Sequence, residues 1–270
     1  MKRVAVCLLA AMVLASLALP CGADPVELVI PAYDPKTGYF EALLVEALRA
    51  AGHDVVVRRL DPSVQQARAV KMMDEDAGIS LIPIFKTPER DAKYVAIDVD
   101  ILGRLMAWRI LLIPTGQQAV YDEVKTLDDY RNLRLVSGFG KDWFDAVVWQ
   151  ENDLLYIEKD GSWNPTLYLM VAARNRGVDN FPRGAVEVPV ELPLHDGLEA
   201  EKRLLFVYER PFIFYLARSA APYRDIIRDA LAAAVKSGLM DRMIRQFFPE
   251  VFDPTGLDLD GRVRIILETP

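Results

Sequence analysis

The chain has 270 residues, of which 32 are Lys or Arg and 39 are Asp or Glu, so its formal net charge is −7. Nucleic acids and anionic membrane surfaces attract proteins with excess Lys and Arg, so this charge disfavours both as partners. The two cysteines, Cys7 and Cys21, and the two histidines, His53 and His195, are too few and too scattered for a disulfide framework or a Cys- or His-ligated metal site.

Residues 1–23 are expected to be a secretory signal rather than part of the fold. Two basic residues, Lys2 and Arg3, precede an apolar run that ends in small residues. This order is typical of a cleavable signal peptide, and the run is too short for a convincing membrane span. We therefore expect cleavage after Ala23 and a periplasmic mature chain, which keeps neither cysteine.

The first part of the mature chain alternates predicted strands and helices. Val26–Ile30 is short, apolar and β-branched, which is typical of a buried strand. Apolar residues then recur at helical spacing from Phe40 until Gly52, which stands where a helix C-cap belongs. The next expected elements are a strand at Asp54–Leu60, a helix at Val64–Glu75 and a strand at Ile79–Ile82. This alternation predicts parallel strands joined by crossover helices, and so an α/β fold.

Two long apolar stretches, Ile101–Ile113 and Leu204–Ala217, exceed the length of most single strands. Strands that cross between two lobes would explain their length. We therefore expect one lobe inserted into another, with two crossing segments. The predicted parts are lobe one at residues 24–101 and 210–270, and lobe two at residues 102–209. Within lobe two we expect a strand at Leu133–Ser137, a helix after Gly140 and a helix at Thr166–Arg176.

Three stretches carry a resemblance to a known family. They are Lys86-Thr87-Pro88-Glu89-Arg90 with the aromatic Tyr94, the segment Val124–Tyr130 that leads into RLVSG and a glycine turn, and the helical run Pro222–Phe248 around Gly238. In this order they resemble the extracytoplasmic solute-binding proteins of ABC importers, which include the polar amino-acid binders. The resemblance implies a type-2 periplasmic-binding fold, with two α/β lobes that close on a small solute. It also implies a monomer without cofactor or enzyme activity, and an inner-membrane ABC permease as partner.

The first stretch supplies the leading candidate residue, Arg90. In the amino-acid binders the Arg of a T-x-x-R segment pairs with the ligand carboxylate, so the resemblance implies that role for Arg90, with Thr87 beside it. A guanidinium matches a carboxylate through two parallel hydrogen bonds, which are strongest where water is excluded. The alternative is a surface arginine paired with Glu89 or Asp91.

Aromatic residues are expected to form apolar walls of the ligand site. These candidates are Tyr33, Tyr39 and Phe85. Phe85 takes a place where the amino-acid binders often have a small hydroxyl residue, which indicates a different ligand.

The turn Gly138-Phe139-Gly140 lies between a predicted strand and a predicted helix. It fails as a dinucleotide fingerprint, because Trp143 stands where a third glycine is needed. Backbone N–H groups at a helix start could instead hold an anionic group, with Lys141 and Trp143 on the same wall. A plain strand-to-helix turn is the alternative.

Arg183 departs from the family pattern. In the amino-acid binders this strand end typically offers an Asp that accepts the ligand's ammonium group, and Glu187 four residues on is the other candidate for that place. A guanidinium there would repel an ammonium group and attract a second acid group. Arg183 is therefore expected to be either a ligand contact or an inter-lobe salt bridge, and its presence favours an anionic solute over an amino acid.

No nucleophile–base signature and no glycine-rich phosphate loop with its lysine appears in the sequence. The sequence therefore favours a binding protein. Two alternatives remain open: a periplasmic enzyme on the same fold, similar to the cyclohexadienyl dehydratases, and a sensor that passes its closed form to a membrane signalling protein.

Overall fold

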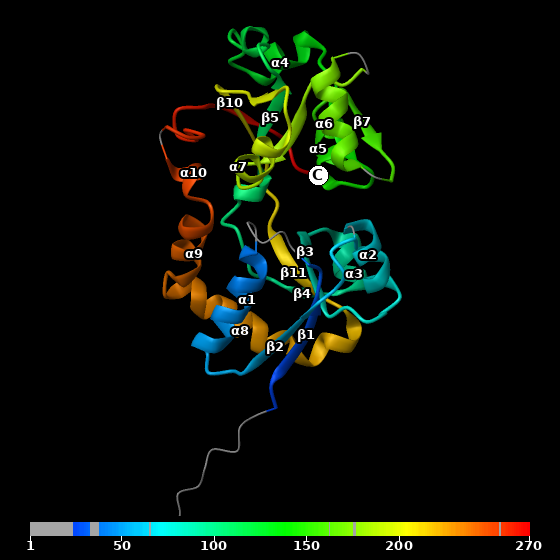
Figure 1. Ribbon diagram of the computed structural model, residues 1–270, viewed down its shortest axis with the longest axis vertical. Coiled ribbons are helices and arrows are strands. Elements are labelled where there is room, and N and C mark those ends of the chain that lie inside the picture. The colour runs from blue at the N-terminus through cyan, green and yellow to red at the C-terminus, as the bar shows by residue number, and fades with distance from the viewer. Residues whose placement is uncertain (1–23, 33–37, 65, 162, 175–176, 254) are drawn as a thin grey trace, which may run out of the picture.

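The computed structural model describes residues 24–32, 38–64, 66–161, 163–174, 177–253 and 255–270, and it shows two α/β lobes, one above the other in Figure 1. The expected signal segment, residues 1–23, lies outside the described part of the chain. Among the described helices, none is long and apolar enough to cross a membrane.

Lobe one is built on two small sheets. Strands β1 and β2 pair in parallel, and β11 lies between β3 and β4 and is antiparallel to both. The N–H of Ser80 donates to the carbonyl of Val29 at 2.7 Å, which links the two sheets. The elements are β1 Val26–Ile30, α1 Tyr39–Ala50, β2 Val55–Arg59, α2 Gln66–Asp74, β3 Leu81–Phe85, α3 Pro88–Lys93, β4 Val95–Ile97, β11 Phe212–Leu216, α8 Arg224–Lys236 and α9 Leu239–Phe247.

The predicted elements of this lobe are present, with ends shifted by up to three residues. Gly52 has a φ of +87° just after α1, the left-handed conformation that glycine adopts without strain. The expected parallel pairing holds for β1 and β2 only. The third predicted strand, β3, pairs with β11 in antiparallel fashion, because β11 returns to lobe one from the other end of the chain.

Lobe two contains a mixed sheet in the order β12-β10-β5-β8, with β9 also paired to β5, and a separate parallel pair of β6 and β7. Its elements are β5 Trp108–Pro114, α4 Leu127–Leu133, β6 Ser137–Gly140, α5 Phe144–Glu151, β7 Tyr156–Lys159, α6 Trp163–Ala173, β8 Phe181–Gly184, α7 Val188–Glu191, β9 Leu198–Ala200, β10 Leu204–Val207 and β12 Val263–Ile266. The strand expected at Leu133–Ser137 is displaced, because Thr126 and Asp129 form a capping box that holds residues 127–133 as a helix.

The crossings between the lobes differ from the prediction. Neither long apolar stretch forms one continuous strand. The first breaks into a connector, a 3-10 turn at Leu105–Ala107 and β5, and the second divides into β10 in lobe two and β11 in lobe one. These breaks place non-strand backbone at both crossings, where a change of direction is needed.

The C-terminal boundary was predicted wrongly. After α9 the chain runs through α10 (Pro249–Phe252) toward lobe two, where β12 pairs in parallel with β10 (Figure 1). Ile265 and Leu267 are buried there. The tail after residue 262 therefore belongs to lobe two, and a third segment crosses between the lobes.

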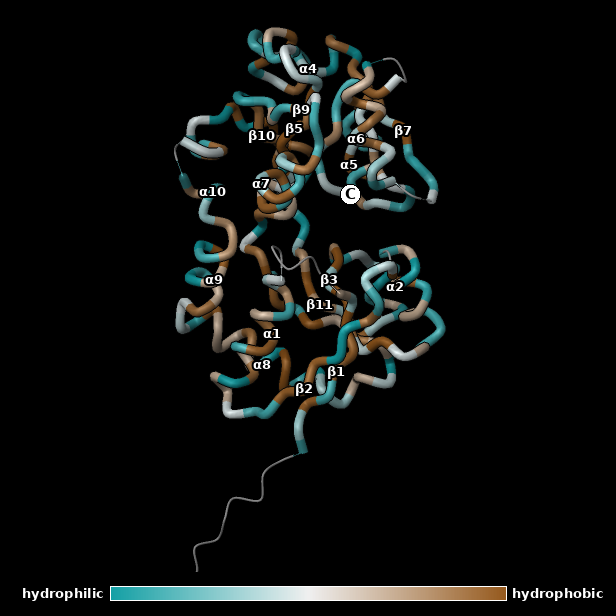
Figure 2. The backbone as a smooth tube through the Cα atoms, viewed as in Figure 1, coloured by the Kyte–Doolittle hydropathy of each residue, from teal (hydrophilic) through white to brown (hydrophobic). Residues whose placement is uncertain are grey.

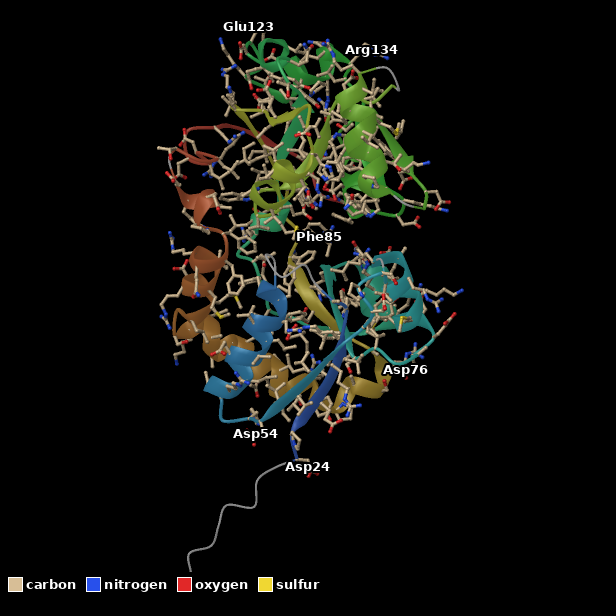
Figure 3. The ribbon with its side chains drawn as sticks, viewed as in Figure 1. Asp24, Asp54, Asp76, Phe85, Glu123 and Arg134 are labelled. Atoms are coloured by element: carbon tan, nitrogen blue, oxygen red, sulfur yellow. The ribbon has the colours of Figure 1, made fainter. Side chains whose placement is uncertain are left out.

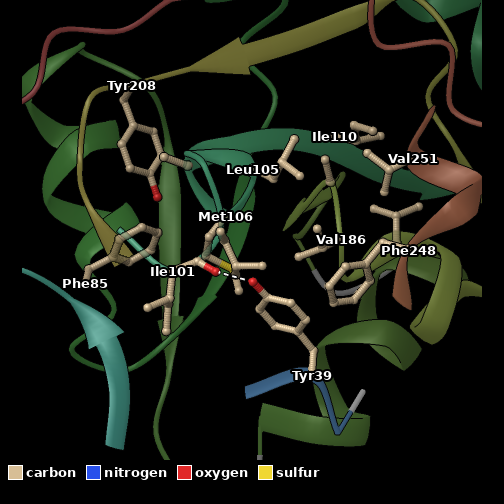
Figure 4. Packing of buried hydrophobic residues seen from close by; sticks show 14 of the residues in the cluster. Tyr39, Phe85, Ile101, Leu105, Met106, Ile110, Val186, Tyr208, Phe248 and Val251 are labelled. Atoms are coloured by element: carbon tan, nitrogen blue, oxygen red, sulfur yellow. Dashed lines mark hydrogen bonds between the residues drawn. The ribbon is translucent and has the colours of Figure 1, made fainter. Parts of the chain in front are cut away.

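Most of the buried apolar residues form one core that continues through the crossing region, and a smaller separate cluster lies in lobe one. The central strands of both lobes carry much of this hydrophobic sequence (Figure 2). Tyr39 illustrates the continuity, since its buried hydroxyl donates to the carbonyl of Ile101 at 2.6 Å, close to Met106 and Phe248 (Figure 4). Tyr39, expected as a wall of the ligand site, is thus a core residue near the first crossing.

Candidate functional site

A cleft between the lobes contains a hollow of about 90 Å³. Phe85, at the end of β3, marks this level of the molecule in Figure 3. A second hollow of about 300 Å³ shares Gln66, Ile84, Arg90, Asp142 and Trp143 with the first and extends toward α6. The smaller hollow is lined from lobe one by Gln66, Ile84, Phe85, Arg90 and Phe212, and from lobe two by Met106, Arg109, Asp142, Trp143, Phe144, Asp145, Arg183 and Glu187.

Arg90 borders both hollows, and short helix α3 positions it. Thr87 is the N-cap of this helix: its side chain accepts a hydrogen bond from the N–H of Arg90 at 3.3 Å, and Pro88 follows at the first helical position. The guanidinium turns back over β3 and donates through Nη1 to the carbonyl of Phe85 at 2.6 Å. Thr87 is buried, so it supports Arg90 from behind.

The charge of Arg90 is not paired within the described residues. No carboxylate of that part of the chain lies within 4.0 Å of its guanidinium, and neither Glu89 nor Asp91 forms the surface pair considered above. Burial lowers the pKa of this half-buried group. A guanidinium remains charged even so, and it therefore presents unused N–H donors at the cleft.

Arg109, which the sequence analysis did not single out, lies at the centre of the lobe-two wall. Its Nε lies 2.6 Å from Oδ1 of Asp145, its Nη2 lies 2.8 Å from Oδ2, and its Nη1 lies 3.1 Å from Glu187. The hydroxyl of Tyr208 donates to Asp145 at 2.8 Å. Burial is the largest single influence on Arg109 and opposes its charge, but Asp145, Tyr208 and Glu187 together outweigh burial and raise the pKa of Arg109.

Arg183 is also buried and is paired within its own lobe. Its Nη2 lies 2.7 Å from Glu187, and its Nε and Nη2 contact the two oxygens of Glu191 at 2.6 and 2.5 Å. All three residues belong to β8, α7 or the turn between them. The predicted inter-lobe salt bridge is therefore wrong. The charge of Arg183 is neutralised inside lobe two, which removes the reason to expect a second acid group on the ligand.

The glycine turn has a different geometry from that expected of an anion site. Phe139 is fully buried against Trp149 and Tyr156, so it does not face the cleft. The N–H groups of residues 141–143 already donate to the carbonyl of Lys159, the carboxylate of Glu158 and the carbonyl of Gly140.

The glycines themselves allow close packing. A Cβ at Gly138 would lie 2.8 Å from Leu167, and one at Gly140 would lie 2.5 Å from the ring of Trp143. Lys141 is exposed and pairs with Asp160 at 3.2 Å beside the second, larger hollow. Trp143 borders both hollows.

The three aromatic candidates, Phe85, Tyr39 and Tyr33, have different outcomes. Phe85 lines the smaller hollow and packs edge-on against Phe212 and beside Phe144 of lobe two. Tyr39 lies in the core, and Tyr33 lies outside the described residues. Within the described residues, no group of three or more His, Cys, Asp or Glu side chains is arranged to hold a metal ion.

Comparison with solved structures identifies the fold of the chain. No protein-family model matches the sequence, and no curated protein matches it. Solved structures do match. An ancestral arginine-binding protein bound to glutamine aligns with a TM-score of 0.59 and 12% identity over 83% of this chain and 98% of that chain. The chain has a type-2 periplasmic-binding fold.

Two further structures show the range of proteins with this periplasmic-binding fold. A probable amino-acid ABC transporter extracellular-binding protein from Bacillus subtilis aligns with a TM-score of 0.59 and 11% identity over 83% of this chain and 99% of that chain. An ancestral amino-acid-binding protein described as a precursor of cyclohexadienyl dehydratase aligns with a TM-score of 0.56 and 13% identity, over 83% and 96% of the two chains. At these identities the likeness establishes the fold.

Within this periplasmic-binding fold, the sequence analysis missed Arg109 and Asp145. One signal was available, because Arg109 interrupts a long apolar stretch and a charge in a buried strand needs a partner. The sequence did not identify that partner, since Asp145 is 36 residues away and belongs to helix α5, whereas Arg109 belongs to strand β5.

Proposed function

We propose that the protein is an extracytoplasmic solute-binding protein, which captures a small carboxylate-bearing solute in the inter-lobe cleft and delivers it to an ABC permease. The observation that carries this proposal is Arg90, a half-buried cation that borders both hollows and has no carboxylate partner among the described residues. A carboxylate bound there would gain charge-assisted hydrogen bonds in a site from which lobe closure excludes water.

The charges of the cleft favour a solute with a single carboxylate. Arg109 and Arg183 are neutralised by Asp145, Glu187 and Glu191, so lobe two adds no free positive charge at this wall. Asp142 also borders the smaller hollow and offers a carboxylate that could accept hydrogen bonds from an ammonium group. Amino acids, which carry one carboxylate and one ammonium group, therefore belong to the proposed ligand class.

The test replaces Arg90 by Ala and compares the variant with Arg218→Ala. Arg218 is an exposed arginine of the same lobe, whose Nε donates to the carbonyl of Lys93 at the end of α3, and it lines neither hollow. Amino acids and small carboxylic acids are screened by calorimetry against the wild type. We expect any ligand found to lose at least about 100-fold in affinity in Arg90→Ala, because a hydrogen bond to a charged group contributes about 1.5–3 kcal/mol and two are lost.

Arg218→Ala should bind as the wild type does, and both variants should keep the far-ultraviolet circular dichroism of the wild type. Unchanged affinity in Arg90→Ala would contradict the proposal.

An enzyme on the same fold is the second candidate, favoured by the likeness to the precursor of cyclohexadienyl dehydratase. The two candidates differ in turnover. If the protein is a binder, incubation with its ligand should raise the melting temperature of the purified protein, and no product should form. Product that accumulates beyond one equivalent of protein would establish the enzyme instead.

A further inference from the structure

Arg183 lies inside a box of side chains with an unusual composition. Three aromatic rings surround its guanidinium carbon, with centroids at 5.1 Å for Trp143, 5.2 Å for Trp163 and 5.0 Å for Phe181. Glu187 and Glu191 supply carboxylate oxygens at 2.5–2.7 Å. Aromatic faces together with carboxylates are the chemistry by which proteins recognise guanidinium and other organic cations.

The box adjoins the ligand cleft. Trp143 borders both hollows, and Trp163 borders the larger one. Glu187 and Arg183 itself border the smaller one. Phe181 and Arg183 are two residues apart on β8, so their side chains share one face of the strand. A cation held by these groups would therefore be part of the wall that a ligand meets.

Stability alone is a weak reason for this arrangement. Burying two charges costs several kcal/mol per ion, and apolar residues of similar volume often serve a core equally well. The arginine does change the cleft, because it fills the box with the chain's own guanidinium and leaves a central hollow of about 90 Å³. Small-molecule pockets usually measure about 300–1,000 Å³.

We propose that Arg183 is a built-in occupant of a guanidinium-binding box, and that it determines specificity by denying this box to ligands with a cationic side chain. This inference rests on the proposed function, since it narrows the class of solute that the cleft accepts. The solute's carboxylate binds at Arg90, and any side chain of the solute that meets lobe two is small or carries no positive charge.

The experiment removes the occupant and supplies it from solution. Arg183→Ala is titrated with methylguanidinium chloride, with sodium chloride at equal ionic strength as the salt control. We expect saturable binding, and a rise in melting temperature of about 3–6 °C at ten times the dissociation constant. The wild type should show neither. If Arg183→Ala is unfolded on its own, methylguanidinium should restore its circular dichroism.

A second substitution tests the carboxylates of the box. Arg183→Ala/Glu191→Gln should bind methylguanidinium at least about tenfold more weakly than Arg183→Ala, because the charge-assisted pair with Glu191 is lost. The proposal is overturned if methylguanidinium neither shifts nor restores Arg183→Ala, if the wild type binds it equally well, or if Glu191→Gln has no effect.

L-Arginine separates this inference from the proposed function, because it carries both a guanidinium and a carboxylate. We expect Arg183→Ala to gain binding of L-arginine that is tighter than its binding of methylguanidinium. In the double variant Arg90→Ala/Arg183→Ala, L-arginine should bind no more tightly than methylguanidinium, whose affinity should stay the same. If Arg183→Ala does not bind methylguanidinium, the proposed box is contradicted. If Arg183→Ala binds methylguanidinium but its affinity for L-arginine does not depend on Arg90, the proposed role of Arg90 is contradicted instead.

Discussion

At the scale of single residues, the arginines that line the cleft differ in whether they are paired with carboxylates. Arg109 and Arg183 are buried and held by carboxylates of their own lobe, whereas Arg90 donates to a carbonyl and keeps its other N–H groups for a ligand. Removing one partner of a buried ion pair costs about 3–5 kcal/mol, so the paired arginines form a fixed wall. Among the described arginines that line the smaller hollow, Arg90 is the one without a carboxylate partner.

His195 makes the stability of the folded protein depend on pH. Its ring stacks on Tyr168 with centroids 3.5 Å apart, and burial together with the positive charge of Arg183 lowers its pKa. Because the unfolded chain then binds a proton more readily than the folded one, stability is complete above the unfolded pKa of about 6.5 and falls as the pH drops below it.

We expect the melting temperature of the wild type to fall more between pH 7 and 5 than that of His195→Gln. His53→Gln is the control variant, because His53 lies after α1 in lobe one. A chemical-shift titration that places the pKa of His195 at or above 6.5 would contradict this explanation.

Residue roles were predictable from the sequence only where local order determines them. Thr87 and Arg90 are three residues apart, so the sequence could place them together, and both lie at the start of α3. The ligand contact that the resemblance implies for Arg90 stays a prediction. The pairing of Arg183 could not be predicted, because it requires α7 to bring Glu191 back toward β8. Tyr39 was expected as an apolar wall of the ligand site, although helical spacing also places it on the buried face of α1.

At the scale of elements, the short helix α3 presents Arg90, the proposed ligand-binding group, at the cleft. Its six residues are too few to be stable alone, so its N-cap and its packing determine its geometry. The chain holds a comparable short helix, α4, whose N-cap is Thr126 and which lies in lobe two away from the cleft (Figure 1).

These two caps form a matched pair of substitutions. Thr87→Ala and Thr126→Ala should each lower the free energy of unfolding by about 1 kcal/mol, since each removes a side-chain acceptor from a helix start. Thr87→Ala should in addition weaken ligand binding about tenfold, because α3 then holds Arg90 less firmly. Urea denaturation and calorimetry measure the two effects. Equal affinity in the two variants would show that the cap of α3 does not support the site.

At the scale of the whole molecule, three segments connect the lobes rather than two. The third begins after α9 and ends in β12, and Asn152 fastens it by two hydrogen bonds of 2.9 Å to the backbone of Glu268. Periodicity alone could not reveal this, because an apolar tail such as VRIIL has a strand pattern that fits the sheet of either lobe. The local pattern identified the strand, and the partner strand is a long-range choice.

Adjacent isoleucines of this tail test its place on lobe two. Ile265 is 2% exposed and Ile266 is 65% exposed, although they are neighbours on one strand. Ile265→Ala should destabilise the protein by about 2–5 kcal/mol, and Ile266→Ala by less than about 0.5 kcal/mol. Urea denaturation distinguishes them. Similar values for both variants would mean that the tail does not pack on lobe two.

The most direct test of the whole account is mass spectrometry of the solute that the protein carries through native purification. The wild type and Arg218→Ala should each release the same small carboxylate-bearing molecule on denaturation, in near-stoichiometric amount. Arg90→Ala, purified in parallel, should release none. A solute that lacks a carboxylate, or one that Arg90→Ala retains in equal amount, would contradict the account.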